Sequence, residues 1–245
     1  MSEPFPDARR VIAAVRATWR PARMDRAGPF DVPSDTAGGR RNCAARLDPV
    51  GASFADADLA AVEALKPGAI FGTLDGIEDA LADAIAARGY REEGATTLMA
   101  GPVAPLLAEP PPPVSGFPHW PPAALAEDIW LSHGQDPARL AVAARAPDPK
   151  AAILLRARDR AAGALFVGVH DNMAVLHMVL TLPGQRRQGV GLIGLRHAAR
   201  FADANGAGWL VLPVEADNAP AVGLYRRAGL SEVGGYRYWR RPSRG

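Results

Sequence analysis

The segment Arg186-Arg187-Gln188-Gly189-Val190-Gly191 is the first candidate for chemistry, because it ends a predicted strand and opens a predicted helix. Glycines at 189 and 191 let a ligand approach the backbone closely, and the first N–H groups of a helix have no intrahelical acceptor. Such donors and the helix dipole bind phosphate, and the two arginines increase the attraction. We expect a phosphate site here. A glycine-rich turn can also have no function beyond reversing the chain. This one lacks the GK[ST] of a P-loop and does not follow the βαβ pattern of a dinucleotide-binding fold.

A second segment, from Asn218 to Leu230, reads NAPAVGLYRRAGL. Members of the GNAT acetyltransferase superfamily combine R-x-x-G-x-G/A with a downstream N-x-x-A-x-x-L-Y-x-x-x-G-[FL] element, and both patterns are present here in that order. The stretch from Gly234 to Tyr238 (GGYRY) is also similar to the last hairpin of that family. Roughly residues 150 to 241 therefore resemble a GNAT domain, which has a mixed α/β sheet.

The resemblance implies an acetyl-CoA-dependent N-acetyltransferase, with acetyl-CoA as co-substrate and a primary amine of a small molecule or protein as acceptor. Backbone amides from Arg186 to Gly191 would hold the pyrophosphate, and Leu180, Thr181 and Leu182 would pair with the pantetheine chain. Asn218 would hydrogen-bond the cofactor arm. Tyr225 would act as the general acid that protonates the departing thiolate.

Both of these side chains also have structural interpretations. Tyr225 follows Leu224 and fits a core aromatic on an amphipathic helix, while Asn218 fits a helix N-cap. The cap and the cofactor contact can coexist at Asn218.

The general base is less well defined by the sequence. Many relatives carry a glutamate at the position of Leu180, and the nearest titratable side chain is His177, whose ordinary pKa suits the role. Strict alternation would place His177 on the opposite face from Leu180, unless a β-bulge resets the phase. A histidine in an apolar strand can equally be structural, and a neutral amine can attack without a base. The missing acid keeps a second class open, a non-catalytic acyl-CoA-binding or interaction protein.

The element order predicts a tandem arrangement. Prolines crowd between Pro102 and Pro122, so we expect a first domain at residues 1–107, a linker at 108–122 and a catalytic domain at 123–245. Apolar spacing predicts helices at 55–65 and 75–88, the second capped by Asp75, around a strand at 69–74. The second half should contain strands at 151–156, 162–170 and 173–182, a helix at 190–205, a strand at 209–214, a helix at 219–228 and a final β-segment to 239.

The first half is expected to be a degenerate copy of the second, although two unrelated α/β segments would also fit. The positions that match Asn218 and Tyr225 hold Glu78 and Ile85, so a second active site is not expected. This half should be structural or wall the acceptor pocket. The glycine-rich segment from Gly38 to Arg41 is expected to be a hairpin turn.

Composition narrows the remaining choices. The net charge is only +2, but residues 183–245 hold ten arginines and four acidic residues. This excess suits a phosphate-rich cofactor better than nucleic acid, because no DNA-binding motif accompanies it. The single cysteine, Cys43, excludes an internal disulfide. No long apolar run or signal-peptide pattern occurs, so we expect a cytoplasmic protein that does not enter a membrane. We expect no metal site. The sequence is compatible with a homo-oligomer.

Overall fold

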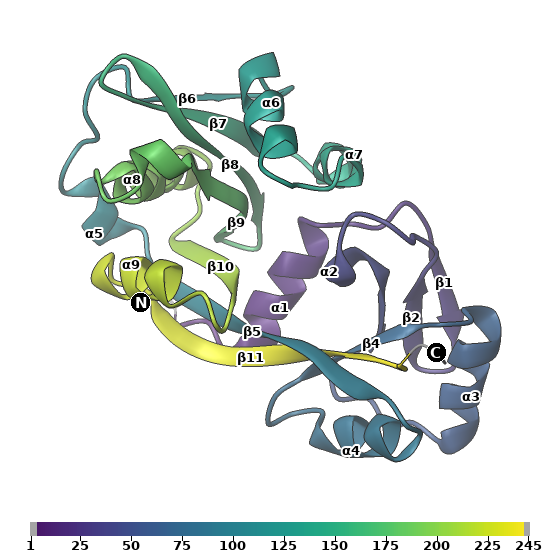
Figure 1. Cartoon of the computed structure of the whole chain (residues 1–245). Coiled ribbons are helices and arrows are strands. Elements are labelled where there is room, and N and C mark those ends of the chain that lie inside the picture. The colour runs from purple at the N-terminus through teal and green to yellow at the C-terminus, as the bar shows by residue number, and fades with distance from the viewer. Residues whose placement is uncertain (1–3, 243–245) are drawn as a thin grey trace.

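The computed structural model describes residues 4–242. The three residues at each end, which belong to the two predicted domains, lie outside the described residues. The chain forms one mixed sheet of eleven strands flanked by helices (Figure 1), in the order β1-β2-β3-β4-β11-β5-β10-β9-β8-β7-β6. The predicted fold class, a mixed α/β sheet, is confirmed.

Among residues 4–107, the first half contributes five strands and five helices. The strands are β1 (Met24–Ala27), β2 (Phe30–Pro33), β3 (Ala44–Leu47), β4 (Ile70–Leu74) and β5 (Arg91–Pro102). The helices are α1 (Ala8–Ala17), α2 (Arg40–Cys43), α3 (Asp56–Leu65), α4 (Asp79–Ala87) and α5 (Ala104–Leu107). The predicted helix-strand-helix order at residues 55–88 is confirmed.

The described part of the second half, up to residue 242, contributes six strands and four α-helices. The strands are β6 (Gly116–His119), β7 (Lys150–Ala157), β8 (Arg160–His170), β9 (Met173–Thr181), β10 (Trp209–Glu215) and β11 (Ser231–Arg240). The helices are α6 (Ala124–Ser132), α7 (Ala138–Arg145), α8 (Val190–Ala204) and α9 (Ala219–Arg227), with a short 3-10 turn at Pro183–Gln185. These elements match the predicted order.

The two halves exchange their last strands. The C-terminal strand β11 pairs antiparallel with β4 of the first half, and β5 of the first half pairs antiparallel with β10 of the second. β5 and β11 also pair with each other, from Arg91 opposite Arg240 to Ala100 opposite Ser231. The exchange joins both halves into one continuous sheet.

The proline-rich segment is partly ordered into this sheet. Residues 116–119 of the predicted linker form β6, which pairs antiparallel with β7. The domain boundary itself stays a prediction.

Two layers of helices hold the second half of the sheet. Apolar residues of α8 pack on one face of β7 to β10, including Leu195, Ala198 and Ala202. Trp130 of α6 and Val142 of α7 pack on the other face, against Phe166 of β8. Strand β9 is therefore fixed from both faces.

The predicted cap of α4 is wrong. The helix begins at Asp79, and Asp75 instead pairs with Arg237 of β11 at 3.0 Å. The side chain of Glu78 accepts hydrogen bonds from the backbone N–H groups of Leu74 (2.8 Å) and Gly51 (3.0 Å). This buried carboxylate therefore holds the turn before the helix.

Within residues 4–242, no helix has the length and apolar character needed to cross a membrane.

Candidate active site

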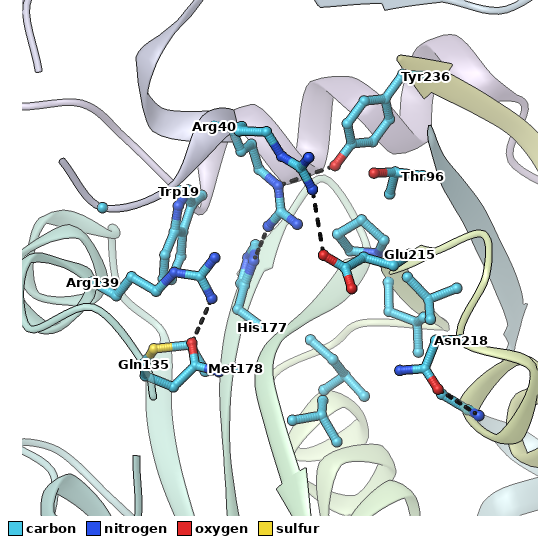
Figure 2. A pocket seen from close by; sticks show the side chains of 18 of the residues that line it. Trp19, Arg40, Thr96, Gln135, Arg139, His177, Met178, Glu215, Asn218 and Tyr236 are labelled. Atoms are coloured by element: carbon cyan, nitrogen blue, oxygen red, sulfur yellow. Dashed lines mark hydrogen bonds and ion pairs between the residues drawn. The ribbon is translucent and has the colours of Figure 1, made fainter. Parts of the chain in front are cut away.

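A cavity of about 280 Å³ lies between the two halves of the sheet (Figure 2). Strands β9 and β10 and helix α9 line one side, with residues from Leu176 to Val179, from Leu212 to Glu215, and Asn218 and Tyr225. The first half and β11 line the other side. The cavity brings together three of the predicted site residues, which are His177, Asn218 and Tyr225.

The cavity exists because β9 and β10 diverge. These parallel strands pair only from Met173 opposite Trp209 to Val175 opposite Val211. Beyond that point no pairing joins them, although both strands continue. The backbone edge of β9 after Val175 is therefore available to a ligand that can form strand-like hydrogen bonds.

A β-bulge in β9 accompanies the divergence. Ala164 of β8 faces Leu180 and Phe166 faces His177, so two residues of β9 oppose one of β8. Met178 in the bulge has a positive φ of 48°. His177 and Leu180 are three residues apart on β9, but they lie opposite Phe166 and Ala164, which are two residues apart on β8. The bulge therefore shifts the alternation of side chains along β9 by one residue. Both side chains lie on the same face of the sheet.

Trp130 of α6 stabilises this bulge. Its indole Nε1–H donates a 2.8 Å hydrogen bond to the backbone carbonyl of Met178, and both residues are buried. The bond satisfies a carbonyl that the irregular strand leaves without a ladder partner.

Tyr225 faces the cavity from α9. Its side chain is 5% exposed, and burial raises the pKa of its hydroxyl to about 12. That hydroxyl has no hydrogen-bond partner among the described residues. The phenol therefore keeps its proton at neutral pH and is available as a donor.

Asn218 caps the same helix. Its side-chain oxygen accepts from the backbone N–H of Ala221 at 3.2 Å, which is the predicted N-cap geometry. The side chain also lines the cavity (Figure 2), so the cap leaves its amide N–H groups available to a ligand.

His177 is buried in a complete hydrogen-bond network. The Arg41 guanidinium, which can only donate, lies 3.0 Å from Nδ1, so Nδ1 is the acceptor and the neutral ring carries its proton on Nε2. The Nε2–H then donates to Thr18 Oγ1 at 2.9 Å, and the Thr18 hydroxyl donates to the carbonyl of Ala14 at 2.8 Å. The ring also stacks on Trp19 at 4.7 Å between centroids.

Burial holds the pKa of His177 well below its ordinary value, and the nearby Arg41 and Arg139 lower it further. A general base needs a free lone pair and an affinity for protons. Here the lone pair accepts from Arg41 and the environment disfavours the charged ring. The arrangement suits a residue that orients Arg41 more than one that takes a proton.

The predicted phosphate site lies at the start of α8, outside the residues that line the cavity. Gly189 precedes the helix with a left-handed backbone (φ 80°), and the first bond of the helix runs from Ile193 N–H to the carbonyl of Gly189. The N–H groups of Val190, Gly191 and Leu192 therefore have no intrahelical acceptor. Arg186, Arg187 and Gln188 are exposed beside them.

The two glycines of this turn serve different purposes. A side chain at Gly189 would meet no atom within 4 Å, so this position opens to the outside. A Cβ at Gly191 would lie 2.5 Å from Cδ2 of Leu224 of α9, so Gly191 allows the close packing of this side chain against α8. This contact joins the phosphate turn to the helix that carries Tyr225.

The sequence profile of the acetyltransferase (GNAT) family matches residues 106–230, about half of the chain. The chain belongs to the GNAT acetyltransferase family. The match covers the diverging strands, the turn before α8, and α9.

Solved structures with the GNAT fold cover nearly the whole chain. A GCN5-related N-acetyltransferase from Kribbella flavida superimposes with a TM-score of 0.74 at 20% identity, over 97% of this chain and 96% of that one. A tandem GNAT protein from the clavulanic acid biosynthesis pathway matches with a TM-score of 0.59 at 16% identity, over 88% and 79% of the two chains. At these identities the likeness concerns the fold.

A curated relative matches a shorter stretch. The streptothricin acetyltransferase of Streptomyces lavendulae is 50% identical over 52 residues, which are 21% of this chain and 28% of the relative. The GNAT chain therefore covers less than a third of that relative's length.

The cavity also contains charged residues to which the sequence assigned no role in the site. Arg40 and Arg41 enter from the segment after Gly38, which is not a hairpin turn, because it leads into the short helix α2. Arg139 enters from α7, and Glu215 from the end of β10. Residues of the first half therefore line this cavity, and its role as a wall of the acceptor pocket stays a prediction. No local motif predicts that Arg40, Arg41, Arg139 and Glu215 meet, because they come from separate elements.

Proposed function

We propose that the chain transfers an acetyl group from acetyl-CoA to a primary amine in the cavity between β9 and β10. The observation that carries the proposal is the cavity itself, where the free edge of β9 meets a partner-free tyrosine hydroxyl. Membership of the GNAT family supports acyl transfer, and the stretch shared with a streptothricin acetyltransferase supports the acetyl group.

The residues present fit acetyl-CoA. The backbone of Leu180 and Thr181 lies in the part of β9 that does not pair with β10, where the pantetheine amides could add hydrogen bonds. Leu182 follows directly, and its own N–H donates to the carbonyl of Ala162 at 2.9 Å. The open N–H groups at the start of α8, with Arg186 and Arg187, suit the pyrophosphate. The side-chain amide of Asn218 would hydrogen-bond the pantetheine arm of the cofactor. When bound, the cofactor supplies the thioester whose carbonyl carbon is attacked.

Tyr225 is proposed as the general acid. The amine nitrogen forms a bond to the acetyl carbon, the carbon–sulfur bond breaks, and the phenol gives its proton to the sulfur. The amine proton leaves to water, and the phenolate regains a proton from solvent. Because its pKa is raised to about 12, the hydroxyl is protonated when the step begins.

His177 is proposed as a positioning residue. It would hold Arg41 at the cavity wall through Nδ1 while remaining neutral. Glu215 is the one carboxylate among the residues that line the cavity, and its charge would attract the ammonium form of an incoming amine. The first half is proposed to wall the pocket, without an active site of its own.

Acetyl-CoA consumption over a panel of primary amines, beside calorimetric titration with CoA, tests the proposal. Turnover with at least one amine, together with saturable CoA binding, is the expected result. CoA binding without turnover on any member would favour a non-catalytic acyl-CoA-binding protein instead. No binding of CoA at all would contradict both the proposed phosphate site at the start of α8 and the proposed reaction.

A further inference from the structure

The cavity has an excess of positive charge. Three guanidinium groups, from Arg40, Arg41 and Arg139, line it against the single lining carboxylate of Glu215. Figure 2 shows Arg40, Arg139 and Glu215 around the cavity. Arg40 pairs with that carboxylate at 3.4 Å. The described part of the chain offers no carboxylate within ion-pair distance of Arg41 or Arg139.

Arg41 is held by neutral acceptors. Its Nε donates to the hydroxyl of Tyr236 at 3.2 Å, and its Nη1 donates to Nδ1 of His177 at 3.0 Å. The guanidinium also lies over the Trp19 ring, 6.0 Å from its centroid. The hydroxyl of Tyr238 is a further neutral hydrogen-bond partner of Arg41. These contacts fix the direction of the group without neutralising it.

Arg139 is held in a similar way. Its Nη1 donates to the side-chain oxygen of Gln135, another neutral acceptor. Gly39 makes room for the guanidinium, because a Cβ there would lie 2.8 Å from Nη2 of Arg139. Asp136, three residues before Arg139, accepts from the backbone N–H of Gly38 at 2.7 Å and so fastens this end of α7 to the first half.

Neither Arg41 nor Arg139 has a carboxylate in ion-pair contact among the described residues, and in a half-buried cavity such groups are unfavourable because burial removes water and like charges repel. The pKa of Arg139 is lowered first by burial and then by the charge of Arg41. A ligand that carries an oxyanion would supply the missing counter-charge and accept from the open N–H groups. A neutral amine would leave both arginines uncompensated.

We propose that the acceptor amine carries an oxyanion, a carboxylate or a phosphate, which Arg41 and Arg139 bind while the amino group faces Tyr225. This inference rests on the proposed function and names the substrate class of the same site. The cavity of about 280 Å³ also favours a small molecule, since it is at the lower end of ligand pockets. Glu215 would attract the ammonium end of such a zwitterion.

Matched acceptor pairs test the proposal. The kcat/KM for acetylation is measured for ω-amino acids of increasing chain length against the corresponding alkylamines, and for O-phosphoethanolamine against ethanolamine. Hydrogen bonds to a charged group give an expected preference of about 10- to 100-fold for the anionic member of the best pair. The two series distinguish a carboxylate from a phosphate.

The variant Arg139→Gln should bring that ratio down toward one. Arg139 is chosen because Arg41 supports His177 and Tyr236, and its replacement could disturb the fold. A matched control is Arg145→Gln on the same helix, since Arg145 pairs with Asp35 at 3.5 Å and does not line the cavity. This control should keep the wild-type ratio. Circular dichroism and thermal melting verify that both variants are folded.

A binding measurement separates this inference from the proposed function. Calorimetric titration of the CoA complex with the best ω-amino acid and its alkylamine needs no turnover. A preference in binding that Arg139→Gln removes supports the anion subsite even if no acetyl transfer occurs. Turnover or binding with no preference for any anionic member would overturn the inference, as would an Arg139→Gln variant that only weakens CoA binding and keeps the ratio.

Discussion

Acidification should destabilise the folded chain through His177. The folded state holds this ring neutral, because burial and the charges of Arg41 and Arg139 lower its pKa well below the ordinary value. In the unfolded chain the same ring titrates near its ordinary pKa of about 6.5. Between the two pKa values the unfolded state binds one more proton, so the free energy of unfolding rises with pH in this window. The contribution is complete above about pH 6.5 and is lost as the pH falls.

The size of the effect follows from the linkage relation. Each pH unit below the unfolded pKa costs about 1.4 kcal/mol. This loss continues only while the pH stays above the folded-state pKa of His177. Protonation would also place an N–H at Nδ1 against a donor of Arg41, 3.0 Å away, so the folded state has no simple way to accept the proton.

Urea unfolding across this pH range, for the wild type and for His177→Gln, measures the effect. Burial and the charge of Arg200 also lower the pKa of His197. The comparison therefore uses the difference in unfolding free energy between the wild type and His177→Gln. That difference should have a slope of about 1.4 kcal/mol per pH unit below about pH 6.5. Replacement of the exposed His170 by Gln controls for the loss of a histidine as such. Parallel pH curves for wild type and His177→Gln would refute the buried neutral histidine.

The phosphate turn and the bulge give two further predictions. Gly189→Asn, which tolerates the left-handed backbone, should weaken CoA binding about 10-fold or more in calorimetry, since a side chain would occupy the open phosphate position. Gly206→Asn at the other end of α8, where the backbone is also left-handed and open, should leave the affinity for CoA unchanged. Equal CoA affinities of the Gly189→Asn and Gly206→Asn variants would contradict the phosphate site. Trp130→Phe should lower the free energy of unfolding by about 1 to 3 kcal/mol, because it leaves the buried carbonyl of Met178 without a donor; an unchanged urea midpoint would contradict the role of that bond.

The second half of the fold could be predicted because its signals are local. Apolar spacing and turn residues fix the meander β7 to β9, and the two GNAT motifs lie within continuous stretches around α8 and α9. The sequence of β9 alone does not predict its bulge, because the bulge is held by Trp130, which donates to the carbonyl of Met178 from a separate helix.

The first half and the acceptor side could not be predicted in the same way. The exchange of β5 and β11 pairs residues more than a hundred positions apart, and no local pattern encodes such a partner. Arg41 and Arg139 meet in one cavity for this reason. The sequence predicts a helix cap at Asp75 because a carboxylate before an apolar stripe usually caps, but Arg237 on the exchanged strand binds it instead.

The single-turnover rate of acetyl transfer by Tyr225→Phe tests the central claim most directly. Phenylalanine keeps the packing of the ring in the core and removes only the hydroxyl that faces the cavity. With an acceptor that the wild type acetylates, the rate should fall by at least about 100-fold while CoA affinity stays within about two-fold. Tyr90→Phe, which removes another buried hydroxyl away from the cavity, should keep the wild-type rate. A folded Tyr225→Phe protein with a near-wild-type rate would contradict the account of this cavity as the place where the departing thiolate is protonated.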